Sequence, residues 1–183
     1  MNHRTGHTAQ LVQTAETSEV LIYQIGSSGQ QLLLDAGVMR RFRKYRQMRW
    51  YQKEAGGQLF ATLESNRVII VEATGPRKTD RRTRFGYLPD RAAERQEIVE
   101  RHAKSLHYIG DWHTHPEQLP QPSHLDLESI AECFRKSKHH LNAFVLVVVG
   151  TKRLPDGLSV SIHDGNERLA LHPDVRQHLD SDI

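Results

Sequence analysis

Apolar residues along the chain occur as short runs in some segments and at helical spacing in others. Short runs rich in Val, Ile, Leu and aromatic residues predict strands; they cover residues 20–26, 31–34, 58–62, 67–72, 108–112, 143–149 and 158–162. Apolar positions that repeat at the spacing of a helical face predict three helices between these strands. Mixed strands and helices of this kind favour a single α/β domain, with the sheet packed against helices.

Each predicted helix follows a polar or charged segment that can begin it. Asp35 is suited to cap a helix that begins near Ala36, a second helix is predicted over residues 91–106, and a third follows Ser123. The positions expected to face inward are Val38, Phe42, Tyr45 and Arg49 in the first helix, Ile98 or Val99, His102 and Leu106 in the second, and Leu127, Ile130, Ala131 and Phe134 in the third. Residues 75–90 are interpreted as a long basic connection.

Composition narrows the class of protein. The 183 residues correspond to about one domain, which we expect over 19–170, with a flexible lead-in over 1–18 and a tail over 171–183. The single cysteine, Cys133, excludes a disulfide framework and a four-thiolate zinc site, and it is typical of a protein of the reducing cytoplasm. The longest apolar run, 143–149, is too short to span a membrane, and the polar N-terminal segment is unlike a secretory signal.

Positive charge is concentrated in two segments of the chain, although the formal net charge is only +3. Residues 40–53 contain seven Arg and Lys residues and no acidic residue, and residues 77–84 contain five, interrupted only by Asp80. Such segments are either solvated surface or a site for an acidic partner. No nucleic-acid-binding motif accompanies the charge, so we expect a protein partner rather than a nucleic acid.

The segment that follows the predicted strand 108–112 carries metal-ligating residues. His113 and His115 are two residues apart, so at the end of a strand their side chains share a face. After a proline-rich connection, Asp126 falls in the first turn of the third helix, where it can supply a third ligand. Two histidines and a carboxylate leave one position open for water, as in catalytic zinc sites. A simpler alternative is that Ser123 and Asp126 only cap the helix.

Glu54 is the candidate proton acceptor beside this site. An open zinc site lowers the pKa of its water to about 7, and a nearby carboxylate can then accept the proton. Glu54 precedes the pair Gly56 and Gly57, which has no side chains and so permits close approach of another strand or of a substrate backbone. The alternative is an exposed glutamate beside a turn.

These residues together resemble the complete JAMM motif, the signature of the MPN/JAB metalloprotease family. The resemblance rests on Glu-x-Gly-Gly-x-Leu-Phe at 54–60, His-Thr-His-Pro at 113–116 and Ser-x-x-Asp at 123–126. It implies a curved mixed sheet between helices, with one zinc ion per chain bound by His113, His115 and Asp126. It also implies that Glu54 is the general base and later the general acid, and that Ser123 helps to hold the tetrahedral oxyanion. Family members hydrolyse the bond after the C-terminal tail of ubiquitin or a ubiquitin-like protein.

A narrower resemblance concerns Thr-Gly-Pro at 74–76, the segment 80–85 and Gly-Asp-Trp at 110–112. These segments are similar to a bacterial subgroup that is encoded beside ubiquitin-like conjugation enzymes, notably in type II CBASS anti-phage operons. The resemblance implies a deubiquitinase-like peptidase that removes a cyclic-oligonucleotide synthase from the targets to which a conjugating enzyme has attached it. Processing of a sulfur-carrier protein, and a binding module of the same fold without activity, are the alternatives.

Two further sets of residues remain open at the level of sequence. We expect Arg81, Arg82 and Arg84 to contact the substrate tail or an acidic surface of the protein that carries it, because the family places a substrate-facing insertion here. Asp111 shares the face of the histidines and Trp112 the opposite face; each has either a structural or a functional role.

Overall fold

The computed structural model describes residues 20–174, and the predicted lead-in over 1–18 lies outside them. Its centre is a sheet of eight strands in the order β1-β2-β4-β3-β7-β8-β9-β10. The strands are β1 (Leu21–Ile25), β2 (Gln30–Leu34), β3 (Gly56–Leu63), β4 (Arg67–Ala73), β7 (His107–Thr114), β8 (Phe144–Val149), β9 (Leu158–His163) and β10 (Arg168–Leu171). The sheet is mixed, because β2 pairs parallel to β4 and β7 pairs parallel to β8, whereas the other neighbours are antiparallel.

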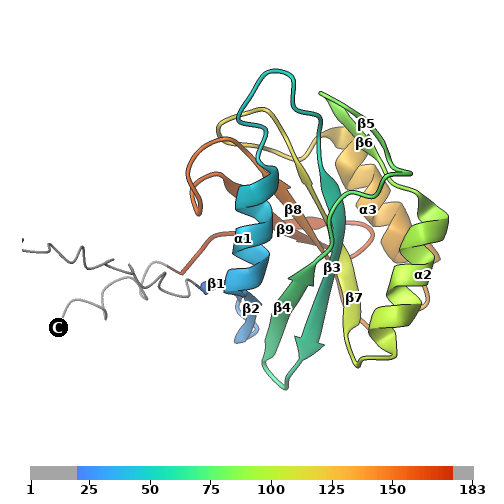
Figure 1. The fold of residues 1–183 in the computed structure, drawn as a ribbon. Helices are drawn as coiled ribbons and strands as arrows, with labels where there is room; N and C mark the ends of the chain where they lie inside the picture. Colours follow the sequence, from blue (N-terminus) through green and yellow to red (C-terminus); the bar gives the residue numbers. More distant parts are fainter. Residues whose placement is uncertain (1–19, 175–183) are drawn as a thin grey trace, which may run out of the picture.

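Helices cover both faces of this sheet, as the sequence predicts (Figure 1). Helix α1 (Ala36–Tyr45) packs on one face, and α2 (Arg91–His102) and α3 (His124–Lys136) lie on the other. The expected α/β fold, with a mixed sheet between helices, is therefore confirmed. None of these helices is long and apolar enough to cross a membrane.

The face under α1 holds the larger apolar core. Asp35 caps α1 as predicted, with its carboxylate accepting a hydrogen bond of 2.8 Å from the Val38 amide. Val38 and Phe42 are buried against strand residues such as Leu34 and Ile70, and Trp112 of β7 joins them. Burial of this apolar surface stabilises the fold. The helix ends at Tyr45, so Arg49 lies beyond it and the expectation that Arg49 continues its inner face is wrong.

Helix α3 agrees with the prediction in both its start and its buried face. Ser123 caps it, Ile130 and Ala131 are buried, and Leu127 and Phe134 pack partly buried beside them. Their partners on the sheet include Phe144 and Val148 of β8. These residues form a second, smaller core on the face opposite α1.

Helix α2 presents a charged face to the sheet, contrary to expectation. Glu94 is its buried residue. Of the positions expected to face inward, Ile98 and Leu106 are half-buried, whereas Val99 is 70% exposed and His102 is also exposed. The helix ends at His102, four residues before the predicted end. On the neighbouring strand β7, Asp111 lies close enough to Arg91 and Glu94 of this helix to interact with both charges.

The long basic connection over residues 75–90 contains a hairpin that the sequence did not predict, formed by β5 (Arg81–Thr83) and β6 (Gly86–Leu88). Asp80 organises it: its carboxylate accepts hydrogen bonds from the Arg77 amide (2.6 Å), the Tyr87 hydroxyl (2.9 Å) and the Asp90 amide (2.9 Å). Strand β10 is the other element that the apolar pattern did not predict, and it reaches Leu171, one residue past the expected end of the domain. Both are short and lack an apolar alternation.

Candidate metal centre

His113 and His115 come together at the end of β7. Their Nε2 atoms are 3.1 Å apart, which confirms that the two side chains share a face. His113 lies within β7, and in the antiparallel pairing of β7 with β3 it stands opposite Gly56. The amide of His115 donates to the carbonyl of Val149 at the end of β8, so the second histidine is held although the strand has ended. Both imidazoles are thus positioned by the central, most buried strands of the sheet.

Asp126 closes the group from the first turn of α3. Its Oδ1 lies 3.3 Å from His113 Nε2, and its Oδ2 lies 3.5 Å from His115 Nε2. The same Oδ2 accepts hydrogen bonds from the Ser123 amide (2.6 Å) and the Ser123 hydroxyl (2.7 Å), in a complete capping box. Capping and ligation are therefore not alternatives, because the cap orients the carboxylate toward the histidines.

The donor set and its spacing suit a tetrahedral zinc ion. The ligand atoms of His113, His115 and Asp126 all lie within 4.8 Å of one another. Ligands ~2.0–2.1 Å from a tetrahedral zinc lie roughly 3.3–3.4 Å apart, and the observed separations are 3.1, 3.3 and 3.5 Å. Although burial acts to raise it, hydrogen bonds from His113 and His115 hold the pKa of Asp126 well below its usual range. The carboxylate is therefore ionised and able to bind a cation.

Glu54 lies in the segment before β3 and lines the same pocket as the three candidate ligands. It is only 5% exposed, so the alternative of an exposed glutamate beside a turn is wrong. Burial raises the pKa of Glu54 to about 7, against a lowering by His115. Its backbone is fixed by the β5–β6 hairpin, since the Glu54 amide donates to Thr83 (2.7 Å) and Arg82 donates to the Glu54 carbonyl.

The glycine pair after Glu54 permits close packing by other parts of the protein. A Cβ at Gly56 would lie 2.5 Å from the Tyr87 ring of β6, and one at Gly57 would lie 2.5 Å from the Thr74 carbonyl oxygen. Real Cβ atoms do not approach so closely, so a side chain at either position would displace the hairpin or the end of β4. The expectation that the pair admits a neighbouring strand is thereby confirmed.

Gln47 connects several segments around the site by hydrogen bonds, a role that the sequence did not predict. Its buried side-chain amide donates to the carbonyls of Gln52 (3.2 Å) and Arg84 (2.9 Å) and accepts from the Thr114 hydroxyl (3.1 Å). Thr114 lies between the two histidines, and its hydroxyl accepts from the amide of Ala55, next to Glu54. Gln47 therefore links the loop that carries Glu54, the hairpin turn and the histidine strand.

The three arginines expected to contact substrate differ in their surroundings. Arg81 is exposed. Arg82 donates to the backbone carbonyls of Lys53 and Glu54, and Arg84 donates to those of Arg49 and Trp50. Arg82 and Arg84 thus hold the hairpin against the loop before Glu54, which leaves Arg81 as the residue of the three that is most open to a partner.

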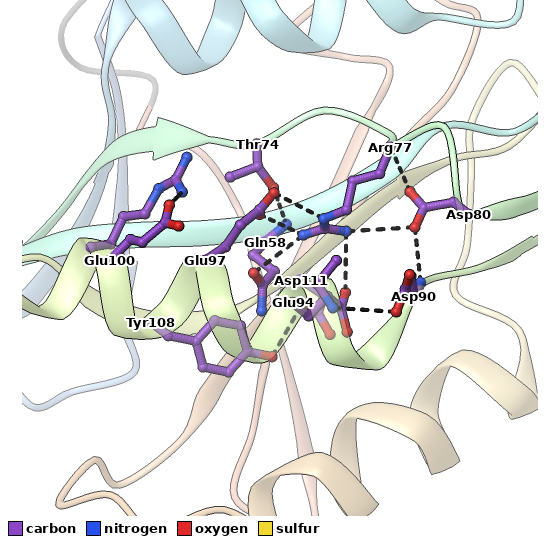
Figure 2. Close-up of polar contacts among 12 residues, drawn as sticks. Gln58, Thr74, Arg77, Asp80, Asp90, Glu94, Glu97, Glu100, Tyr108 and Asp111 are labelled. Carbon is purple, nitrogen blue, oxygen red and sulfur yellow. Dashed lines mark hydrogen bonds and ion pairs between the residues drawn. The ribbon is translucent and has the colours of Figure 1, made fainter.

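A cluster of charged side chains, most of them partly or fully buried, gathers beside α2 (Figure 2). Arg77 Nε donates to Glu97 Oε1 (2.9 Å), and its guanidinium also lies 3.7 Å from Asp80 and 3.9 Å from Glu94. On β7, Asp111 accepts a hydrogen bond of 3.0 Å from the Tyr108 hydroxyl. Asp111 is therefore a partner within this cluster and not an exposed acid. No single motif marks these residues, since they come from three separate segments of the chain.

A pocket of 590 Å³ connects these features. The candidate ligands and Glu54 form one part of its wall, and residues 85–89 form another. Arg91, Glu94 and Leu125 are among its other lining residues. Phe85 is 75% and Leu125 is 74% exposed, so the pocket has apolar rims above a charged floor.

Comparison with known proteins gives related sequences and a related fold. Residues 35–162 match the family model described as prokaryotic homologs of the JAB domain. A protein of Escherichia coli (strain TW11681) named "CD-NTase/cGAS isopeptidase" is 32% identical over 95 residues, which cover 50% of this chain and 61% of that protein. A protein of the same name from Vibrio cholerae serotype O1 is 30% identical over 119 residues, covering 63% of this chain and 73% of that protein.

Among solved structures, the solution structure of protein DSY2949 from Desulfitobacterium hafniense superposes with a TM-score of 0.50 at 12% sequence identity. The superposition covers 75% of this chain and 85% of that one. At this level of identity the likeness concerns the fold alone.

Proposed function

Because residues 35–162 match its family model, the chain belongs to the prokaryotic homologs of the JAB domain, and we propose that it is a zinc-dependent isopeptidase. In this proposal, it hydrolyses the bond after the C-terminal tail of a conjugated protein. The observation that carries the proposal is the position of Glu54 in one pocket with His113, His115 and Asp126. Those three residues would hold zinc, which when bound supplies a Lewis acid that makes water acidic near neutral pH.

Glu54 is the residue proposed to move the proton. Its carboxylate accepts a proton from the attacking water as the water oxygen bonds to the carbonyl carbon of the isopeptide. The same carboxyl then gives that proton to the lysine nitrogen as the C–N bond breaks. The products are a free C-terminal carboxylic acid, which ionises at neutral pH, and a free amine. A buried carboxyl whose pKa is raised to about 7 is suited to both transfers near neutral pH.

Ser123 is proposed to help hold the oxyanion. Its hydroxyl lines the pocket and is exposed, but in this structure it donates to Asp126 Oδ2. To serve the oxyanion it has to rotate away from Asp126, which remains bonded to the Ser123 amide at 2.6 Å. The backbone half of the cap therefore keeps Asp126 in place while the hydroxyl is used.

The substrate tail is proposed to lie in the 590 Å³ pocket, along the β5–β6 hairpin. An extended peptide can add to the hairpin as a further strand, with its last residue over the metal ligands. Arg81 would contact the tail or the acidic surface of the protein that bears it. Replacement of Arg81 by Ala should raise KM for a protein conjugate more than for a short tail peptide, because charge complementarity mainly steers encounter and selects partners. Equal KM values for wild type and variant at low salt would remove Arg81 from the interface.

The names of the relatives suggest the protein that bears the tail. Two of them are named CD-NTase/cGAS isopeptidases, and we propose a nucleotidyltransferase of that class, one that makes cyclic oligonucleotides in CBASS defence, as the conjugated protein. The conjugating enzyme that attaches it to its targets would be the second partner. The proposal thus places the chain in a conjugation system and not in the processing of sulfur carriers.

The proposal is tested with a purified conjugate of such a synthase, joined through its C-terminus to a lysine. Wild-type protein should release the synthase, EDTA should stop the reaction, and added zinc should restore it. Glu54→Gln should fold normally and lose ~10²–10⁴-fold in rate. Cleavage of a ubiquitin-like sulfur-carrier fusion in place of the synthase conjugate would favour the alternative substrate. Zinc-loaded protein that cleaves neither would be a binding module.

A further inference from the structure

A second cleft adjoins the metal centre and has no part in the proposed tail site. It has a volume of 470 Å³ and meets the tail pocket at Pro116, which lines both and follows the candidate ligand His115. Its walls come from the loop after α1, from the segment around Gln118 and from the connection between β8 and β9. The two clefts therefore share a wall residue that is adjacent in sequence to a candidate metal ligand.

The charge of this second cleft has one sign. Arg49, Arg84 and Lys152 line it, and none of its described lining residues is Asp or Glu. Two acidic residues close in sequence to the lining residues are not themselves part of the lining. Asp156 forms an ion pair of 3.0 Å with Lys152. The Glu117 carboxylate lies 3.8 Å from His115 Nδ1. Arg49 belongs to the basic segment 40–53, for which the proposed tail site gives no role.

Exposed apolar side chains accompany the cations. Trp50 is 80% exposed and Met48 is 59% exposed, and both line the cleft. The ring of Tyr51, 62% exposed, makes an edge contact with Trp50 at 5.9 Å. Tryptophan, tyrosine and arginine are the residues most enriched among those that dominate the energy of protein interfaces. Single exposed apolar residues are ordinary, but this group adjoins a cleft of uniform charge.

The cleft is held open by hydrogen bonds within the chain. Arg84 donates to the carbonyls of Arg49 and Trp50, and Arg46 donates to the carbonyl of Thr151. The Arg49 amide donates to Gln52 Oε1 at 2.7 Å, which fixes the turn that carries Trp50. A loop tethered on both sides binds a partner with less loss of conformational entropy than a free loop.

We propose that this cleft binds an acidic segment of the protein that carries the modified lysine, on the amine side of the scissile bond. The inference rests on the proposed isopeptidase function, because it assigns the leaving side of the same bond. The tail occupies the larger pocket up to the metal ligands, the lysine crosses Pro116, and carboxylates near that lysine meet Arg49 and Lys152. The enzyme then selects its targets by the acidic surroundings of the lysine as well as by the tail.

The first test measures binding without cleavage. The chain has two tryptophans, and Trp112 is buried whereas Trp50 lies in the cleft, so Trp50 emission reports on the cleft. An acidic lysine-centred peptide should change the emission saturably, and Trp50→Phe should abolish the change.

The double variant Arg49→Glu with Lys152→Glu should weaken binding of this peptide about three- to tenfold. The matched double variant Lys104→Glu with Lys138→Glu changes exposed positions outside the cleft and should not weaken it. Equal weakening by both pairs, or binding of a single-stranded oligonucleotide in place of the peptide, would overturn the proposal.

The second test uses two isopeptide substrates with the same synthase tail and different lysine peptides, one acidic and one basic. Wild type should cleave the acidic substrate with the higher kcat/KM, and Arg49→Glu with Lys152→Glu should reverse that preference. A variant that had only lost stability would slow both substrates alike. An unchanged preference would overturn the inference even where both substrates are cleaved, whereas failure to cleave either would reject the isopeptidase function and leave the binding test to decide on the cleft.

Discussion

The two faces of β7 meet very different surroundings, although their residues alternate along one strand. Trp112 points toward α1, where its ring packs against Phe42 at 5.1 Å and its Nε1 donates to the Thr74 carbonyl at 2.9 Å. Asp111 and His113, on either side of it in sequence, point toward the charged cluster and the metal centre. One face thus contributes apolar burial, and the other holds ionisable groups, among them the candidate metal ligand His113.

The difference shows how a central strand can hold buried ionisable groups, although burying charge is unfavourable in free energy. Burial of ionisable groups is unfavourable unless they are paired, and Arg77 and its carboxylate partners illustrate such pairing. The apolar face under α1 contributes the surplus of stability that this requires. Substitutions on the two faces should therefore affect different quantities, and the following predictions run from the largest expected effect to the smallest.

Trp112→Ala should have the largest effect on stability. Loss of a fully buried aromatic side chain costs about 3–5 kcal/mol of unfolding free energy, because it removes apolar contacts and leaves a cavity. Urea titration followed by circular dichroism measures the change. Trp112→Phe, which keeps most of the ring contacts, is the control and should lose much less. Equal losses would mean that the contact between α1 and β7 is not a main source of stability.

Arg77→Met should lower the free energy of unfolding by about 3 kcal/mol, because removing one member of a buried ion-pair group leaves the others unpaired. Arg101→Met is the matched control: its partner Glu72 is 37% exposed, and such surface pairs contribute about 0–1 kcal/mol. The same urea titration compares them. An Arg77→Met variant as stable as wild type would show that the cluster has no structural role.

Gln47→Leu should cost about 1–3 kcal/mol, because it leaves buried polar partners without hydrogen bonds. Its effect on catalysis should be more specific. The link between the Glu54 loop and the histidine strand is lost, so kcat should fall while bound metal is retained and KM for a tail peptide changes little. Gln47→Asn, which keeps both an amide donor and an acceptor on a shorter side chain, should retain more activity than Gln47→Leu. The reverse order would exclude this positioning role.

The parts of the molecule that the sequence predicted are those with a local signal. Asp35 and Ser123 marked two helix starts, alternation placed His113 and His115 on one face, and the apolar run at 143–149 gave β8. The convergence of Asp126 on the histidines was expected from the order and spacing of these residues and from the proline-rich connection between them, and it is confirmed.

The parts that the sequence did not predict depend on contacts between distant segments. Nothing near Gln47 indicates that its amide bonds Arg84 and Thr114, and nothing in α2 indicates that Glu94 is buried in preference to Val99. Helical spacing identifies an inner face only where that face is apolar. The β5–β6 hairpin was hidden for a related reason, because a buried Asp80 organises it instead of an apolar alternation.

The measurement that tests the central claim most directly is the metal content of three purified proteins by native mass spectrometry. Wild type and Glu54→Gln should each bind about one zinc ion per chain, because Glu54 is proposed to move a proton and not to bind the metal. His115→Ala should bind essentially none, while its apolar core and its resistance to urea stay close to those of wild type. Equal zinc in His115→Ala and wild type would contradict a metal centre formed by His113, His115 and Asp126.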